Sequence, residues 1–389
     1  MKAVGLFSVL QNWRVGYFRR MIETYPVDLT IVHGNDVPGT KRINTKAVVP
    51  FGRIALAHHH LMTGASGNKA PLVFFKGLWR TLACQKADVL LLEGASNIAN
   101  ALIALVWARV NKVPVVWWTL GELPGRKYSF VGKLFRGFVA AIERRCDVLM
   151  LYSSQALAYT DRIGVPREKC VVAVNVIETE KAVAESESLI PKRNELIVEI
   201  MGRVTPLVVY VGALAAGKGL EVLPDLFARV RAAVPDARLL VVGDGALRSV
   251  LADSFRSLGC GDAVVFVGEK TADVGKYLVC GDVFLMPGLG GLAISHSMSY
   301  GVPVVCSAGD GVEGDLVVNG ETGFLCTPES GSGSREDCMV QACVSILQST
   351  ELRERLSRNA LRMVTERFTG AKMVENMYRA LTLAKQSRG

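Results

Sequence analysis

Short, continuous runs of apolar residues recur along the chain, and longer amphipathic segments separate them. Such runs, rich in Val, Leu and Ile without strict alternation, are typical of strands that are buried on both faces of a parallel sheet. They fall into an earlier and a later series: 2–9, 28–33, 88–93, 114–119, 147–153 and 171–174, then 207–212, 238–243, 263–268, 282–286, 303–306 and 323–326. Strands that alternate with helices in this way predict two doubly wound parallel sheets.

The length of the chain also favours two domains. It has 389 residues, and a single hydrophobic core rarely grows beyond roughly 250 to 300 residues. The polar and charged segment 178–195 is the best candidate for a linker between the two series of strands. We expect a first domain over 1–180, a linker over 181–205, a second domain over 206–365, and a C-terminal helix over 366–389 that returns to the first domain.

Composition excludes several classes of protein. The longest lipid-like segment, 98–118, is interrupted by Arg109 and Lys112 and contains Pro114, so it reads as a buried helix followed by a strand. The apolar run at the N-terminus is too short for a secretory signal and is expected to form the first strand. Nine scattered cysteines without CxxC spacing predict neither a disulfide framework nor a zinc site, which favours a reducing cytosol.

Positive charge is concentrated in the first half of the chain. The net charge is +9, but residues 1–185 hold 24 Lys and Arg against 13 Asp and Glu, a balance of +11, which leaves −2 for the rest. Within this half, segment 125–145 combines basic residues with an apolar set at helical spacing, namely Phe130, Leu134, Phe138 and Ile142. Such a stripe usually packs on the protein's own sheet. The alternative is contact with an anionic membrane surface or a phosphate-bearing partner, whereas no nucleic-acid-binding motif is present.

Three glycine-rich loops follow strands of the second series. They are YVGALAAGKG at 210–219, VVGDGALR at 241–248 and PGLGG at 287–291. In doubly wound folds the carboxyl ends of the strands meet helix N-termini, whose free N–H groups and positive dipole ends bind anions. Each loop alone is weak support, because glycines after strands are often turn residues. Together with the Lys218 ammonium they predict a site for an anionic ligand that carries a diphosphate.

The order of these motifs resembles a known family. YVGALAAGKGLEVL, ARLLVVGDGALRSVL, GLAISHSMSYGVPVV and NGETGFL follow one another as in the retaining glycosyltransferases of the GT-B fold, the large group marked by a Glu-x7-Glu motif. The resemblance covers most of 206–370 and is looser in the first half, where it rests on 144–178. It implies an α/β protein with two Rossmann-like, doubly wound parallel-sheet domains that face each other across a cleft.

The chain departs from the family pattern at three positions. Gly288 and His296 stand where similar enzymes have the two glutamates, and Ala213 stands where they usually have an arginine. The resemblance implies that the second position contacts the ribose, and a neutral imidazole offers one acceptor and one donor for such a contact. Lys218 is retained, so we expect it to hold the diphosphate with the helix dipoles. Arg203, or a basic residue of the first half, is a candidate to replace the missing arginine.

Candidate site residues follow from the loops and from the resemblance. Those expected to bind the donor are Gly212, Gly217, Lys218, Gly243, Gly245, Glu269, Gly288, Leu289, Gly290, Gly291, Leu292 and His296. Those expected on the acceptor side, in loops that follow strands of the first domain, are Gly16, in the expected loop 12–17, together with His33, Glu93 and Thr119. Lys218 and Glu122 are the candidate catalytic residues, the latter as a base. We assign the triplet His58, His59 and His60 a structural or interfacial role rather than metal binding, because adjacent histidines do not share a face.

The resemblance implies transfer of a sugar from a nucleotide sugar, UDP- or GDP-linked, to a hydroxyl of a glycan or polyprenyl-linked acceptor, with retention at the anomeric carbon. No DxD motif is present, so no metal and no other cofactor is expected. The basic first half, together with what the resemblance implies, favours synthesis of bacterial cell-surface polysaccharide or lipopolysaccharide by a cytoplasmic protein, peripheral at the inner face of the plasma membrane. Two alternatives remain open: a GT-B protein that binds a nucleotide sugar without transferring it, and a sugar-nucleotide epimerase.

Overall fold

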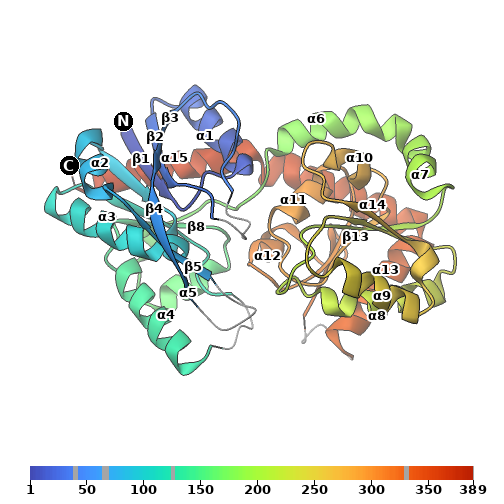
Figure 1. The fold of residues 1–389 in the computed structure, drawn as a ribbon. Helices are drawn as coiled ribbons and strands as arrows, with labels where there is room; N and C mark the ends of the chain where they lie inside the picture. The colour runs from blue at the N-terminus through green and yellow to red at the C-terminus, as the bar shows by residue number, and fades with distance from the viewer. Residues whose placement is uncertain (38–42, 64–69, 124–127, 328–332, 389) are drawn as a thin grey trace. The chain divides into compact units, whose positions relative to one another are not determined.

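The computed structural model describes residues 1–37, 43–63, 70–123, 128–327 and 333–388. The chain forms two compact units (Figure 1). The first contains most of the chain up to Val174 together with the C-terminal segment that begins at Ala371, and the second contains Asn175–Gly370. Each unit is built around its own parallel sheet.

The sheet of the first unit has the strand order β3-β2-β1-β6-β7-β8-β9. Its strands are β1 (Lys2–Phe7), β2 (Asp28–Gly34), β3 (Gly52–Leu56), β6 (Val89–Leu92), β7 (Val115–Thr119), β8 (Val148–Leu151) and β9 (Cys170–Val172). All neighbours pair in parallel, and the strands of the expected first series are all present. The sequence did not predict β3, which carries half-exposed residues, nor the antiparallel hairpin of β4 (His58–Thr63) and β5 (Ala70–Phe75).

The sheet of the second unit has the strand order β12-β11-β10-β13-β14-β15. Its strands are β10 (Leu207–Val211), β11 (Arg238–Val242), β12 (Val264–Gly268), β13 (Val283–Met286), β14 (Val304–Ser307) and β15 (Gly323–Cys326). All neighbours again pair in parallel, so the second predicted series is confirmed in full. Residues of β10 and β13 are almost completely buried, as expected for strands covered on both faces.

Helices connect the strands and cover the sheets. In the first unit they are α1 (Asn12–Thr24), α2 (Leu78–Gln85), α3 (Ile98–Val110), α4 (Phe130–Glu143) and α5 (Ala156–Arg162), with most of α15 (Gly370–Gln386). In the second unit they are α6 (Thr179–Leu189), α7 (Arg193–Met201), α8 (Leu223–Ala233), α9 (Arg248–Ser257), α10 (Val274–Leu278), α11 (Leu292–Ser299), α12 (Val312–Leu316), α13 (Arg335–Gln348) and α14 (Thr350–Arg362).

The segment 178–195 is not an extended linker. It forms α6 and the start of α7, and α6 packs against α10 and α11. Thr179, Ala182 and Ser186 are the buried residues of α6, small side chains that suit close packing between helices. The expectation of a polar linker was therefore wrong, because the segment forms helices that belong to the second unit.

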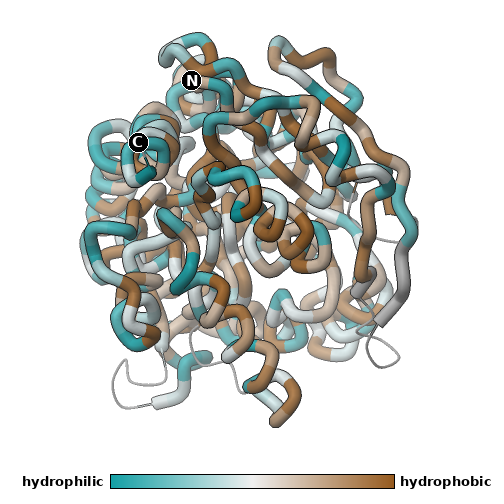
Figure 2. The backbone as a smooth tube through the Cα atoms, turned by 90° about the vertical axis from the view of Figure 1, so that its left-hand side faces the viewer, coloured by the Kyte–Doolittle hydropathy of each residue, from teal (hydrophilic) through white to brown (hydrophobic). Residues whose placement is uncertain are grey.

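Helix α4 does not bury its apolar stripe. Phe130, Leu134 and Phe138 are 75%, 61% and 46% exposed. The helix is instead anchored through its opposite face, where the buried residues are Val139, Ala140 and Glu143. The more usual of our two interpretations, packing of the stripe on the protein's own sheet, is thus wrong. In the hydropathy colouring of Figure 2, α4 is the helix that projects at the bottom of the view, and hydrophobic residues recur along it.

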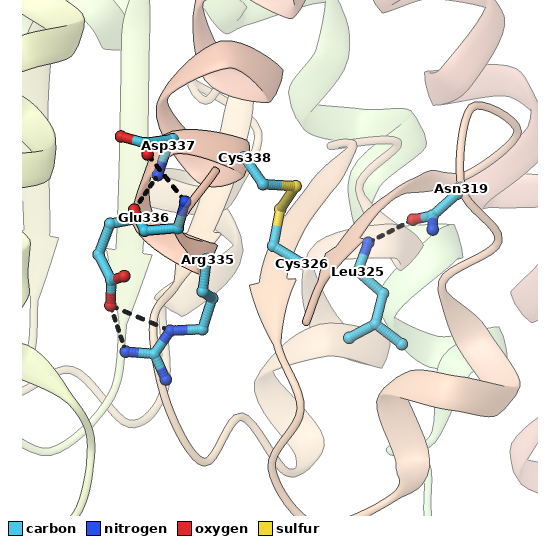
Figure 3. The surroundings of a disulfide bond; sticks show 8 residues. Asn319, Leu325, Cys326, Arg335, Glu336, Asp337 and Cys338 are labelled. Atoms are coloured by element: carbon cyan, nitrogen blue, oxygen red, sulfur yellow. Dashed lines mark hydrogen bonds and ion pairs between the residues drawn. A yellow bond between two sulfur atoms is a disulfide. The ribbon is translucent and has the colours of Figure 1, made fainter. Parts of the chain in front are cut away.

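One disulfide lies in the second unit. Cys326, at the end of β15, is bonded to Cys338 in the first turn of α13, with 5.8 Å between their Cα atoms (Figure 3). The irregular spacing of the cysteines predicted no disulfide framework. This disulfide forms nevertheless, because the fold brings together two cysteines that lie 12 residues apart in the sequence. The other described cysteines are free. Among the described residues, we find no helix with the length and apolar character required to cross a membrane.

Candidate functional site

The crossover point of the second sheet lies between β10 and β13. From β10 the chain continues to β11 on one side, and from β13 it continues to β14 on the other. In parallel α/β sheets, ligands bind outside the carboxyl ends of the strands at the point where the strand order reverses. The loops that follow these two strands are 212–219 and 287–291, two of the glycine-rich segments that the sequence singled out.

These two loops touch each other through their backbones. A Cβ atom at Gly288 would overlap the carbonyl group of Lys218 and lie 2.8 Å from the Gly219 nitrogen. A Cβ at Gly219 would lie 2.9 Å from the Pro287 oxygen, and Gly219 has a φ of +65°. The Lys218 ammonium donates a hydrogen bond of 2.6 Å to the Leu289 carbonyl. The close approach of the two loops therefore requires glycine at position 288.

The third predicted loop packs against the first. Gly243 and Gly245 have φ values of +148° and +154°, and a Cβ on either would overlap a backbone carbonyl of the 212–214 segment. The loops are joined by the Leu214 N–H, which donates to the Asp244 carbonyl at 3.0 Å. The structure thus brings together the three glycine-rich loops at one edge of the sheet, as the strand order requires.

His296 lies in the second turn of α11, whose preceding residue Gly291 has a φ of +54°. Burial lowers the pKa of the imidazole to about 4, so the ring is neutral at physiological pH. Its centroid lies 5.6 Å from that of the Tyr300 ring. The neutral His296 ring has one hydrogen-bond donor and one acceptor, as the sequence argument assumed. Its contact with a ribose stays a prediction.

The sequence argument missed a carboxylate beside this loop. Glu313, on α12, is 1% exposed, and it accepts hydrogen bonds from the backbone N–H groups of Gly309 and Gly311. Burial raises its pKa, and the neighbouring Asp310 acts in the same direction. A Cβ at Gly309 would lie 3.2 Å from the Cα of Leu289, so Glu313 fixes a turn that contacts the 287–291 loop. The glycine-rich pattern of 309–314 is the signal that could have found it.

Arg203 cannot replace the missing arginine at position 213. It precedes the amino end of β10 and is paired with Asp236 at 2.9 Å, whereas Gly212 follows the carboxyl end of the strand. With a rise of about 3.3 Å per residue, the five residues of β10 separate the two ends by more than ~13 Å. Arg203 thus lies at the wrong edge of the sheet, and the expectation that it could supply this cation was wrong.

A different cation lies at the correct edge. Arg248 begins α9, directly after the 241–248 loop, and donates to Asp244 at 2.7 Å. A Cβ on Gly268, at the end of β12, would lie 3.8 Å from an Arg248 nitrogen. The next residue, Glu269, is exposed. Its predicted contact with the donor stays a prediction.

The first sheet reverses between β1 and β6, and a buried ion pair occupies that point. Glu93, one of the expected acceptor-side residues, lies 2.7 Å from Arg14 and accepts a hydrogen bond of 2.7 Å from the Ser8 N–H. The Arg14 guanidinium also packs over the rings of Phe7 and Trp13, at 4.6 and 4.7 Å. Sequence reasoning missed Arg14, because it treated 12–17 as a loop.

The remaining first-unit candidates have local structural partners. Thr119 donates to the buried Glu143 at 2.8 Å. His33 accepts from Arg53 at 2.9 Å, and burial lowers its pKa. Glu122 is ion-paired with Arg162, and its role as a base stays a prediction.

Gly16 and the histidine triplet are placed by regular secondary structure. Gly16 is buried inside α1, so the expected loop at 12–17 is wrong, because the helix already begins at Asn12. The triplet begins strand β4, and the His58 ring accepts a hydrogen bond of 3.1 Å from the Asn35 N–H. Over the described ranges, no cluster of three or more His, Cys, Asp or Glu residues suits a metal ion.

Two Rossmann-like units with parallel sheets, and glycine-rich loops at the crossover of the second, define the GT-B fold. Residues 202–363 match the family described as glycosyl transferases group 1. The matched segment contains all the loops of the second-unit site.

The chain is also similar to known relatives and, in its fold, to solved structures. Sulfoquinovosyl transferase SQD2 of Arabidopsis thaliana is 29% identical over 71% of this chain and 51% of its own length. N-acetyl-alpha-D-glucosaminyl L-malate synthase of Bacillus anthracis is 23% identical over 59% of this chain and 63% of its own. The chain thus spans between half and two thirds of these relatives. Anabaena HepE, solved with UDP and glucose, superposes with a TM-score of 0.72 at 15% identity, covering 98% of this chain and 99% of that one.

Proposed function

We propose that the chain transfers a sugar from a nucleotide diphosphate to a hydroxyl of a glycan or lipid-linked acceptor, with retention of the anomeric configuration and without a metal ion. The observation that carries this proposal is the contact of loops 212–219 and 287–291 at the crossover of the second sheet, within the matched segment. HepE was solved with UDP, which supports a nucleotide-sugar donor, UDP- or GDP-linked. Synthesis of cell-surface polysaccharide or lipopolysaccharide is the setting that we propose.

In the proposed reaction, the bond between the anomeric carbon and the phosphate oxygen breaks, and the acceptor oxygen forms the new glycosidic bond. The acceptor proton passes to the leaving phosphate. The protein then contributes position and charge rather than a nucleophile. Lys218 and the backbone N–H groups of the glycine-rich loops would stabilise the diphosphate, and the neutral His296 would contact the ribose.

Removal of the Lys218 ammonium tests this assignment. Loss of one preorganised donor of this kind typically lowers kcat by about 10²- to 10³-fold, so we expect Lys218→Ala to fall in that range. Arg203→Ala is the matched control, because it removes a cation from the opposite edge of the same sheet. Equal effects of the two variants on turnover would contradict the proposed site.

A thermal-shift screen with UDP-, GDP- and ADP-sugars identifies the donor. A ligand at a hundredfold excess over its dissociation constant stabilises the protein by about 2.7 kcal/mol. Radiolabelled donor, incubated with lipid-linked and glycan acceptors, then distinguishes transfer from binding without transfer. Turnover that disappears in EDTA and returns with magnesium would contradict the metal-independent mechanism.

A further inference from the structure

An apolar helix face is left open to solvent in the first unit. On α4 the stripe of Phe130, Leu134 and Phe138 continues to Ile142, and the adjacent Val131 is 73% exposed. Single exposed apolar residues need no explanation, but a contiguous face of large side chains marks an interaction surface. We propose that this face, together with the neighbouring part of α3, docks on the surface of an anionic lipid bilayer. The proposal is independent of the reaction proposed above.

Positive charge flanks the stripe without compensation by exposed acids. The segments 98–113 and 128–146 contain six basic residues: Arg109, Lys112, Lys133, Arg136, Arg144 and Arg145. Their only carboxylate, Glu143, is 1% exposed and hydrogen-bonded to Thr119 and Tyr159. Lysine and arginine beside an amphipathic helix are attracted to the negative surface potential of anionic lipids.

A groove beside the stripe is suited to a hydrocarbon chain. It has a volume of about 400 Å³ and lies between α3 and α4. Its lining residues are Leu102, Leu105, Val106, Arg109, Val110, Ile142 and Arg145. Ile142 belongs to both the stripe and the groove, so the two form a continuous apolar surface. The Arg109 side chain donates to the Arg145 carbonyl, and this bond links the ends of the two helices at the groove.

The charge distribution favours a bilayer over a second copy of this chain. If two copies met through this face, each would bring its own Lys133, Arg144 and Arg145 against those of the other, and like charges at an interface are unfavourable. Anionic headgroups instead neutralise these residues, while the acyl region accepts the aromatic side chains. The same combination of charge and apolar residues is typical of helices that lie in the membrane interface.

Co-sedimentation of the full chain with lipid vesicles tests the proposal. We expect binding to vesicles of phosphatidylcholine with about one third phosphatidylglycerol, and much weaker binding to phosphatidylcholine alone, with a loss of affinity at high salt. The triple variant Phe130→Ser, Leu134→Ser, Phe138→Ser should bind at least tenfold more weakly. The charge variant Lys133→Gln, Arg144→Gln, Arg145→Gln should reduce binding to the anionic vesicles without changing the low affinity for neutral ones.

Matched controls separate docking from misfolding. Val250 and Leu258 of the second unit are 57% and 47% exposed, so Val250→Ser with Leu258→Ser removes exposed apolar surface elsewhere and should leave vesicle binding unchanged. All substituted side chains are exposed, and each variant should keep the thermal unfolding midpoint of the parent. Absence of binding to anionic vesicles, or binding that the triple variant retains, would overturn the proposal. Self-association that the triple variant abolishes, without vesicle binding, would assign the face to a second copy.

Discussion

The contact between loops 212–219 and 287–291 can be tested by adding one methyl group. In Gly288→Ala the new Cβ would overlap the Lys218 carbonyl group and lie 2.8 Å from the Gly219 nitrogen, whereas ordinary contact begins at 3.4 Å, so the loops must separate by more than about 0.6 Å. The atoms in the way are backbone atoms that cannot rotate aside. We therefore expect a destabilisation near the upper end of the range for overpacking, about 2 to 3 kcal/mol. For a unit of this size that lowers the unfolding midpoint by roughly 4 to 12 °C.

Gly290→Ala is the matched control in the same loop. Its Cβ would also meet an atom at 2.8 Å, but that atom is the terminal methyl of Ile294, which can move. We expect a cost below about 1 kcal/mol. Thermal unfolding with and without a UDP-sugar measures both stability and donor binding. If the two variants proved equally mild, the loops would not be in backbone contact and the explanation for glycine at 288 would be refuted.

Two further predictions concern stability. His296 has a pKa of about 4 in the folded chain against an ordinary 6.5; the unfolded chain therefore binds more protons between these values, and stability falls by about 3 kcal/mol as the pH drops through this window. His296→Gln should flatten the pH dependence of urea unfolding, and parallel curves for the two proteins would contradict it. The Cys326–Cys338 bond closes a loop over 12 residues, so under oxidising conditions Cys338→Ser should lose about 3 kcal/mol. In the presence of a reductant, the parent and Cys338→Ser should have the same free energy of unfolding. If the variant were still less stable in reductant, the effect would come from packing and not from the disulfide.

The strands and the position of the second-unit site could be predicted because both depend on local patterns. Buried parallel strands appear as continuous apolar runs, and strand order then brings the glycine-rich loops to one edge. The disulfide and the contact of the Glu313 turn with the 287–291 loop could not be predicted, because each depends on which segments the fold brings together. The position of Glu93 directly after a strand identified it as a candidate. Its partner Arg14 was missed, because we predicted a loop where α1 begins.

Helix α4 shows a limit of periodicity. A period of 3.6 residues divides a helix into two faces but does not say which face the rest of the protein covers. The stripe of large apolar residues looked like the packed face, yet the helix is attached through small residues and one buried carboxylate. The size of the side chains thus indicated the wrong face of α4 as the packed one. Only the positions of the surrounding elements show which face is buried.

The glycine at position 288 and the lysine at position 218 are best understood together. Because a side chain is absent at 288, the 287–291 loop approaches the Lys218 backbone closely enough for the Leu289 carbonyl to accept from the ammonium at 2.6 Å. An ammonium has three N–H donors, and this bond uses one of them while fixing the direction of the side chain. A glutamate at 288 could not be accommodated without moving the loop, and it would then remove the contact that orients the cation. Glycine at position 288 therefore keeps the loop in the place from which the Leu289 carbonyl orients the Lys218 ammonium.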